Sequence, residues 1–221
     1  SNSTYVGMEP LIRNQILNGS EYMPAFKQNQ ILATNIYSWP EIGGTHTRQQ
    51  DLRAVNPMFR SGDACYQNNC QRCVVTYEAR RRGYDVHAKP YLFQRLDTLP
   101  FDDEENGWPS VFENSVLEYC GAEDSSDVKN NIHNKMQSWG EGARAIVAVD
   151  YLCGGGHVFM AEFTNGEVHY VDPQNAMENC EEYFNIINTR TVNILRTDNC
   201  AFTDNVRDCC EGTAYDLFNG S

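Results

Sequence analysis

The segment His157–Pro173 (HVFMAEFTNGEVHYVDP) places the strongest constraint on how this chain can fold. It contains two runs rich in β-branched and aromatic residues, which are typical of strands. The runs flank Asn165-Gly166, the dipeptide that most strongly indicates a two-residue hairpin turn. The segment therefore predicts an antiparallel hairpin in which Thr164 faces Glu167.

Continued from that turn, the register places four side chains on one face of the hairpin. His157 falls opposite Gln174, and Phe159 falls opposite Asp172. Because side chains alternate along a strand, all four point the same way. His157 and Asp172 are then diagonal neighbours, within reach of an imidazole–carboxylate hydrogen bond.

A helix is predicted over Cys70–Arg82. Cys70, Cys73, Val74 and Tyr77 recur at helical spacing, so they share one face. Three arginines occupy the last turn, where positive charge is favourable, and Gly83 supplies the stop.

The remaining patterns mix helices with strands and predict an α+β fold. We expect a helix from Pro109 to Cys120 and another from a cap at Ser126 to Trp139. We expect strands at Tyr84–Ala88, at Ala143–Leu152 in the centre of the sheet, and at Thr191–Arg196.

The first part of the chain has a different composition. Two helices are expected there, at Met8–Leu17 and Tyr22–Ala33, followed by a long loop or linker over residues 37–57. We therefore interpret residues 1–60 as an N-terminal helical extension or linker, and residues 61–221 as one catalytic domain.

The charge excludes several classes of partner. The chain has 17 lysines and arginines against 30 acidic residues, a formal charge of −13. Nucleic-acid binders and proteins that dock on anionic membranes normally present basic surfaces. The acidity suggests instead a protein partner with a basic surface.

Cys70 has the surroundings that a nucleophile needs. It begins a helix directly after Asn68-Asn69, where unpaired N–H groups and the helix dipole favour a thiolate. The same N–H groups would stabilise an oxyanion. His157, oriented by Asp172, would serve as base and then as acid.

Other interpretations remain open at this point. Cys73 lies on the same helix face and is a second candidate nucleophile. A CxxC pair is also compatible with a disulfide, a redox pair or half a zinc site, although no second ligand pair with zinc spacing follows. His46 and His87 have no evident partner, and a histidine that begins a strand is often structural.

Three segments together resemble the papain-fold toxin domains described as glutamine deamidases. Residues 69–90 (NCQRCVVTYEARRRGYDVHAKP) resemble the family's nucleophile helix, and residues 142–149 (GARAIVAV) resemble the strand that follows. Residues 155–174 (GGHVFMAEFTNGEVHYVDPQ) resemble its histidine strand and its Asp-Pro-Gln strand.

The resemblance implies a papain-like fold and a catalytic triad of Cys70, His157 and Asp172, with no metal or organic cofactor. It implies hydrolysis of a glutamine side-chain amide of a target protein to glutamate. Alternatives are a cysteine peptidase or acyltransferase with the same triad, or a non-catalytic interaction module of a phage or secretion structure.

The same resemblance implies a setting for the protein. Such domains belong to bacterial toxins and effectors that are secreted or injected and act in the cytosol of a target cell. The implied partners are the target protein and a cognate immunity protein, without nucleic acid or membrane.

Overall fold

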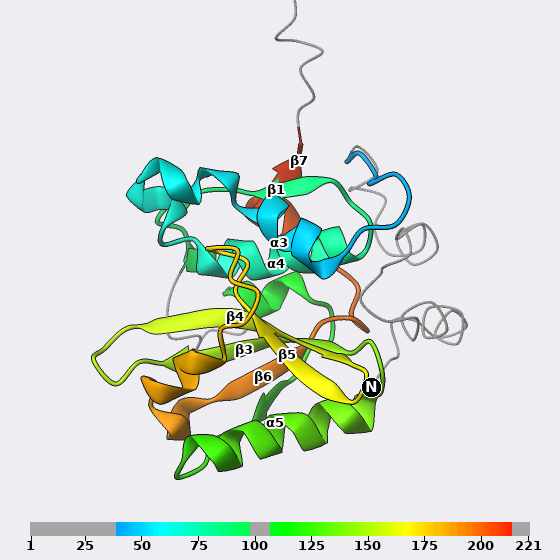
Figure 1. The fold of residues 1–221 in the computed structure, drawn as a ribbon. Coiled ribbons are helices and arrows are strands. Elements are labelled where there is room, and N and C mark those ends of the chain that lie inside the picture. Colours follow the sequence, from blue (N-terminus) through cyan, green and yellow to red (C-terminus); the bar gives the residue numbers. More distant parts are fainter. Residues whose placement is uncertain (1–38, 98–106, 214–221) are drawn as a thin grey trace, which may run out of the picture.

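The fold was obtained as a computed structural model, which describes residues 39–97 and 107–213. A five-stranded sheet lies between a layer of helices around α4 on one face and helix α5 on the other (Figure 1). The predicted α+β class is confirmed. The helices expected at Met8–Leu17 and Tyr22–Ala33 lie outside the described residues.

The described residues contain helices and strands in mixed order along the chain. The α-helices are α3 (Arg48–Val55), α4 (Cys70–Arg81), α5 (Ser125–Trp139) and α6 (Val206–Cys209). The strands are β1 (Val86–Ala88), β2 (Leu117–Tyr119), β3 (Arg144–Asp150), β4 (Gly156–Thr164), β5 (Glu167–Val171), β6 (Asn193–Arg196) and β7 (Cys210–Gly212). Short 3₁₀ turns are η3 (Pro57–Ser61), η4 (Ala64–Tyr66), η5 (Arg95–Asp97), η6 (Trp108–Val111), η7 (Glu181–Asn185) and η8 (Thr189–Thr191).

The main sheet is antiparallel, with strand order β2-β6-β3-β4-β5. Strand β3 is flanked by β4 and β6, so its predicted central position is confirmed. Burial on both faces explains why its sequence is apolar with little alternation.

The hairpin of β4 and β5 has the predicted turn. Asn165 and Gly166 both have positive φ, at 54° and 77°, as a type I′ turn requires. Thr164 pairs with Glu167, and the ladder continues to Met160. The expected pairing of His157 and Phe159 with Gln174 and Asp172 is wrong, because the ladder ends at Val171.

The chain leaves the ladder beyond Val171 because it turns back on itself. Backbone bonds join Asp172 to Met177 in both directions, at 2.9 and 3.0 Å. The turn contains Pro173, which has no N–H to offer to a ladder. Asp172 is nevertheless held next to the start of β4, as described below.

Alternation of side chains gives the sheet two apolar faces. One face packs against α4 and includes Ile146, Val158 and Met160. The opposite face packs against α5 and includes Val147 and Phe159. The core therefore consists of two layers, one on each side of the sheet.

Helix α4 is buried along its whole length, from Cys70 to Arg81. It has the predicted extent, and Gly83 follows it with φ 102°. Its charged side chains meet fixed partners: Arg72 bonds to Asp97, and Glu78 bonds to Arg144 of β3, at 2.8 and 2.7 Å. The helix is thus joined to the sheet by ion pairs as well as by apolar contacts.

The last turn of α4 is held by a second group of buried charges. Asp51 of α3 accepts bonds from Arg80 and Arg81, at 3.1 and 3.0 Å, and lies 2.7 Å from Nδ1 of His46. Arg81 also bonds to Glu162 of β4. The expectation that His46 lacks a partner is therefore wrong.

A small second sheet is formed by β1 and β7. It places His87 opposite Glu211, and the His87 Nε2 to Glu211 Oε1 distance is 3.1 Å. This histidine also has a partner, contrary to expectation. The pairing ties the chain after α4 to the C-terminal part of the described residues.

One predicted helix and one predicted helix cap are wrong. Residues 109–120 form the short turn η6 and then strand β2, with Asn114 left-handed at φ 56° between them. Pairing with β6 supplies the backbone bonds that a helix would have made. Helix α5 is capped by Asp124, whose side chain accepts from Asp127 N–H, and not by Ser126.

The stretch expected to be a loop over residues 37–57 contains α3. Thr47 and Gln50 form a capping box at its start, a signal that was present in the sequence. Helix α3 packs against α4 through Asp51, as described above. The domain boundary near residue 60 stays a prediction.

Replacing Asp51 by Asn should lower the free energy of unfolding by about 3 kcal/mol or more, because two buried guanidinium groups lose a shared carboxylate. Urea denaturation followed by circular dichroism measures this change. The matched control is Glu123→Gln, which breaks an ion pair whose side chains are 81% and 68% exposed. We expect that control to change stability by less than about 0.5 kcal/mol. Equal effects of the two variants would refute the role given to Asp51.

Candidate active site

Cys70 is the first residue of α4. The carbonyl of Asn69 accepts from Arg72 N–H and Cys73 N–H, both at 3.0 Å. The N–H groups of Cys70 and Gln71 lie in the first turn, where no preceding carbonyl of the helix can accept from them. The side chain of Asn69 does not cap them. Two backbone donors therefore remain at the helix tip, next to the Cys70 sulfur.

The Asn69 side chain is used elsewhere, in a buried network that joins three segments. Its amide donates to Asn56 Oδ1 at 3.0 Å and to the Lys89 carbonyl at 3.1 Å. Asn56 donates in turn to the Gln174 carbonyl at 2.9 Å. The start of α4 is thus bonded directly to the segment that follows Asp172.

His157 lies at the beginning of β4, after the β3–β4 turn that projects at the left of Figure 1. Its Nε2 is 2.8 Å from Oδ2 of Asp172. Tyr151 stacks on the imidazole, with ring centroids 6.0 Å apart and an interplanar angle of 18°. Nδ1 is the ring nitrogen that Asp172 does not use, and the Cys70 sulfur lies close enough to interact electrostatically with the imidazole.

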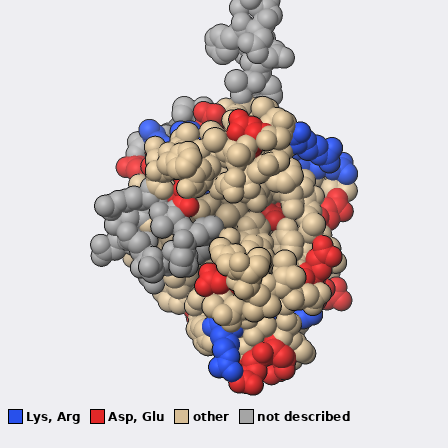
Figure 2. Space-filling view, turned by 90° about the vertical axis from the view of Figure 1, so that its left-hand side faces the viewer, with Lys and Arg blue, Asp and Glu red and all other residues tan. Residues whose placement is uncertain are grey.

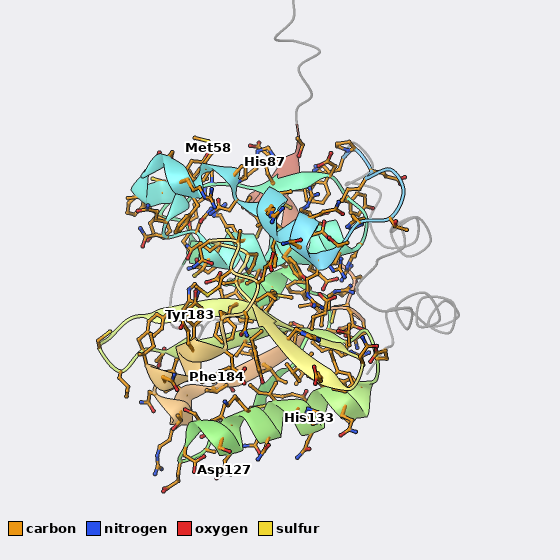
Figure 3. All side chains as sticks on the ribbon, in the orientation of Figure 1. Met58, His87, Asp127, His133, Tyr183 and Phe184 are labelled. Atoms are coloured by element: carbon orange, nitrogen blue, oxygen red, sulfur yellow. The ribbon has the colours of Figure 1, made fainter. Side chains whose placement is uncertain are left out.

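Asp172 is 1% exposed, and its carboxylate accepts three bonds. Besides His157, the donors are the Tyr183 hydroxyl at 2.6 Å and the Gln174 N–H at 2.9 Å. Figure 3 shows Tyr183 at the same end of the sheet as the β3–β4 turn, whereas its neighbour Phe184 belongs to the core against α5. These bonds fix the carboxylate and, through it, the imidazole ring.

Tyr183 was not predicted from the sequence. It donates to Asp172 and packs edge-on against His157, with ring centroids 5.6 Å apart. It lies in the turn η7, with no local motif that marks a tyrosine as a partner of a distant carboxylate. Only the tertiary arrangement identifies it.

Three influences set the protonation of His157. Burial opposes the charged form, but the electrostatic interaction with Cys70 and the hydrogen bond to Asp172 outweigh it, raising the pKa of His157 to about 10. The imidazolium is therefore the favoured form at neutral pH. A thiolate beside an imidazolium is the reactive pair of cysteine-nucleophile enzymes.

The two cysteines of the CxxC pair have different surroundings. Cys70 contacts His157, and its thiol also donates to Gln71 Oε1 at 3.3 Å. Cys73 is fully buried in the core beneath the helix, and burial raises the pKa of its thiol well above the ordinary value. The structure thus brings Cys70, His157 and Asp172 together, whereas it buries Cys73 in the core beneath α4.

Both members of the CxxC pair are free thiols, as are the other seven cysteines, all of which lie in described segments. No cluster of three or more histidine, cysteine or acidic side chains within residues 39–97 and 107–213 has the arrangement of a metal site.

Comparison with known proteins identifies one similarity. Residues 68–177 match the model of the family described as papain fold toxin 1, glutamine deamidase. The match runs from the residues before Cys70 to those after Asp172, so it includes all three side chains assembled here. Neither the curated proteins nor the solved structures contain a significant match.

The charge on His157 can be measured by titrating its ring proton resonances in NMR spectra. Replacing Cys70 by Ala or Asp172 by Asn should lower the pKa of His157 from about 10, because each change removes an interaction that favours the imidazolium. Cys73→Ala is the matched control and should leave the pKa within the titration error. A pKa of His157 that does not respond to Cys70→Ala would contradict the geometry described here.

Proposed function

Because residues 68–177 of this chain belong to the papain-fold toxin family of glutamine deamidases, we propose that Cys70, His157 and Asp172 are the residues that carry out its deamidation. The substrate is a glutamine side chain of a target protein. The observation that carries the proposal is the position of His157, which interacts electrostatically with Cys70 and is hydrogen-bonded to the buried Asp172.

In the first step, the Cys70 thiolate attacks the carboxamide carbon of the glutamine. The S–C bond forms, the carbonyl electrons move to oxygen, and a tetrahedral intermediate results. His157, as imidazolium, then donates its proton to the amide nitrogen, the C–N bond breaks, and ammonia leaves. The product of this step is a thioester between Cys70 and the glutamine carbon.

The negative oxygen of the intermediate needs donors that are already in place. The N–H groups of Cys70 and Gln71 at the tip of α4 meet this need, because the Asn69 side chain is bonded to Asn56 and Lys89 instead of to them. Donors of this kind typically contribute a factor of about 10²–10³ to the rate.

In the second step, neutral His157 takes a proton from water, and the resulting hydroxide attacks the thioester. The C–S bond breaks, glutamate is released, and the Cys70 thiolate and the imidazolium are restored. The overall reaction consumes one water and converts one amide into a carboxylate and an ammonium ion, because ammonia takes up the proton that the new carboxylic acid loses. Asp172 and Tyr183 stay bonded around His157 and keep its ring in position.

The toxin family implies delivery into another cell, and we propose that the protein is secreted or injected and acts on its target in the cytosol. Its producer would be protected by a cognate immunity protein. Among the described residues, no helix is both long and apolar enough to cross a membrane.

The proposal is tested by incubating the protein with a cell extract of candidate targets and locating modified glutamines by peptide mass spectrometry. Deamidation replaces NH₂ by OH at one side chain and leaves the chain intact. Replacing Cys70 or His157 by Ala should reduce the rate at least about 10³-fold, because each removes a group that takes part in bond making.

The matched control is Cys73→Ala, which removes the neighbouring thiol and should retain activity. Loss of activity in Cys73→Ala alone would reassign the nucleophile to Cys73. Cleaved chains would point to a cysteine peptidase, and a transferred acyl group would point to an acyltransferase. Targets that are bound but not modified would point to an interaction module.

A further inference from the structure

A cavity of about 580 Å³ lies beside Cys70 and has no part in the reaction steps above. Its lining comes from η4, from the first turn of α4 and from residues 91–97. The two walls are joined, because Tyr91 N–H donates to the Cys65 carbonyl at 2.7 Å. The cavity is thus formed by segments that pack on one another around the start of α4.

We propose that this cavity binds an apolar side chain, aromatic or large aliphatic, of the residue next to the glutamine that is deamidated. The substrate would then be a glutamine beside a hydrophobic residue in an accessible segment of the target protein. This inference rests on the proposed function and specifies which glutamines the enzyme selects.

The first support is the position of the cavity relative to the nucleophile. Gln71 lines the cavity, and its Oε1 accepts the hydrogen bond from the Cys70 thiol at 3.3 Å. When the glutamine side chain of a substrate reaches the Cys70 sulfur, the Cα atoms of the residues before and after that glutamine each lie about 3.8 Å from the glutamine Cα. A neighbouring side chain is therefore within reach of the cavity.

The second support is the chemistry of the lining. Tyr91 and Phe93 contribute aromatic rings, which contact each other edge-on with centroids 4.6 Å apart, and Ala64 adds a methyl group. The carboxylate of Asp97 also borders the cavity, but it is paired with Arg72 through two bonds, at 2.8 and 2.9 Å. Since this charge is already compensated, the cavity favours an apolar occupant over an ionic one.

The third support is the conformation of Phe93. Its ring is 83% exposed and its φ is 57°, a left-handed value that is unfavourable for a bulky residue. The strain is imposed by Asp97, whose Oδ2 accepts from the N–H groups on both sides, those of Leu92 and Gln94, each at 3.1 Å. A strained and exposed aromatic residue is typical of a ligand-binding position.

The surface at the end of the molecule where α4 begins is also consistent with an apolar occupant of the cavity. Figure 2 shows the face on the side where α4 and β4 begin, and its centre is hollowed. Most side chains around the hollow are neither basic nor acidic, and acidic side chains border it at several points.

The test uses the full chain and short peptides that each contain one glutamine. The residue before or after the glutamine is Phe, Leu, Gly or Glu, and deamidation is followed by mass spectrometry. We expect kcat/KM to be at least about tenfold higher for Phe or Leu than for Gly on one side of the glutamine, and lowest for Glu.

Replacing Phe93 by Ala should reduce the Phe-to-Gly ratio of kcat/KM toward one, mainly through a higher KM for the Phe peptide. The matched control is Tyr119→Ala, which truncates another aromatic residue that is 63% exposed, on the sheet-edge strand β2. In that control the Phe-to-Gly ratio of kcat/KM should equal the ratio measured for the unaltered protein.

The outcomes separate this inference from the proposed function. Deamidation of all peptides at equal rates would overturn the specificity pocket and leave the deamidase intact. A preference for Phe that survives in Phe93→Ala would also overturn it. Absence of deamidation in every peptide and in every intact target protein would overturn the proposed function itself.

Discussion

The position of the Cys70 sulfur depends on the way helix α4 is buried. Four of its twelve residues are charged, yet the whole helix is buried. Glu78 is paired with Arg144 of β3, and Arg81 is paired with Glu162 of β4. A buried charge without its partner costs several kcal/mol, so the helix cannot slide or rotate relative to the sheet. The tip of α4 is therefore fixed opposite the start of β4, where His157 lies.

The contact between His157 and Asp172 could be predicted because its determinants are local. Asn165-Gly166 specifies the turn, and the turn sets the register of the strands on either side. The contact between His157 and Asp172 forms even though the ladder is shorter than expected, because Asp172 directly follows the last pair, Met160 and Val171, and His157 lies three residues before Met160 on β4. Cys70 was identified because it begins a predicted helix directly after Asn68-Asn69.

The parts that were not predicted depend on partners far away in the sequence. Strand β2 was expected to be helical because Pro109 and Gly121 have the positions of helix start and stop signals. Pairing with β6 makes it a strand instead. Tyr183 and Asn56 belong to the site through single hydrogen bonds to Asp172 and to the Gln174 carbonyl. Helix α3 was missed for a different reason. Its capping box is a local signal that was visible in the sequence.

The acidity of the chain and the cavity beside Cys70 act over different distances. A formal charge of −13 would attract a target with a basic surface before contact, over about 8 Å at physiological salt, and does not distinguish one glutamine from another. The lining formed by Tyr91 and Phe93 acts only at contact and has its acidic neighbour Asp97 compensated by Arg72. Added salt should therefore slow association with a target, whereas the choice of glutamine depends on the aromatic lining.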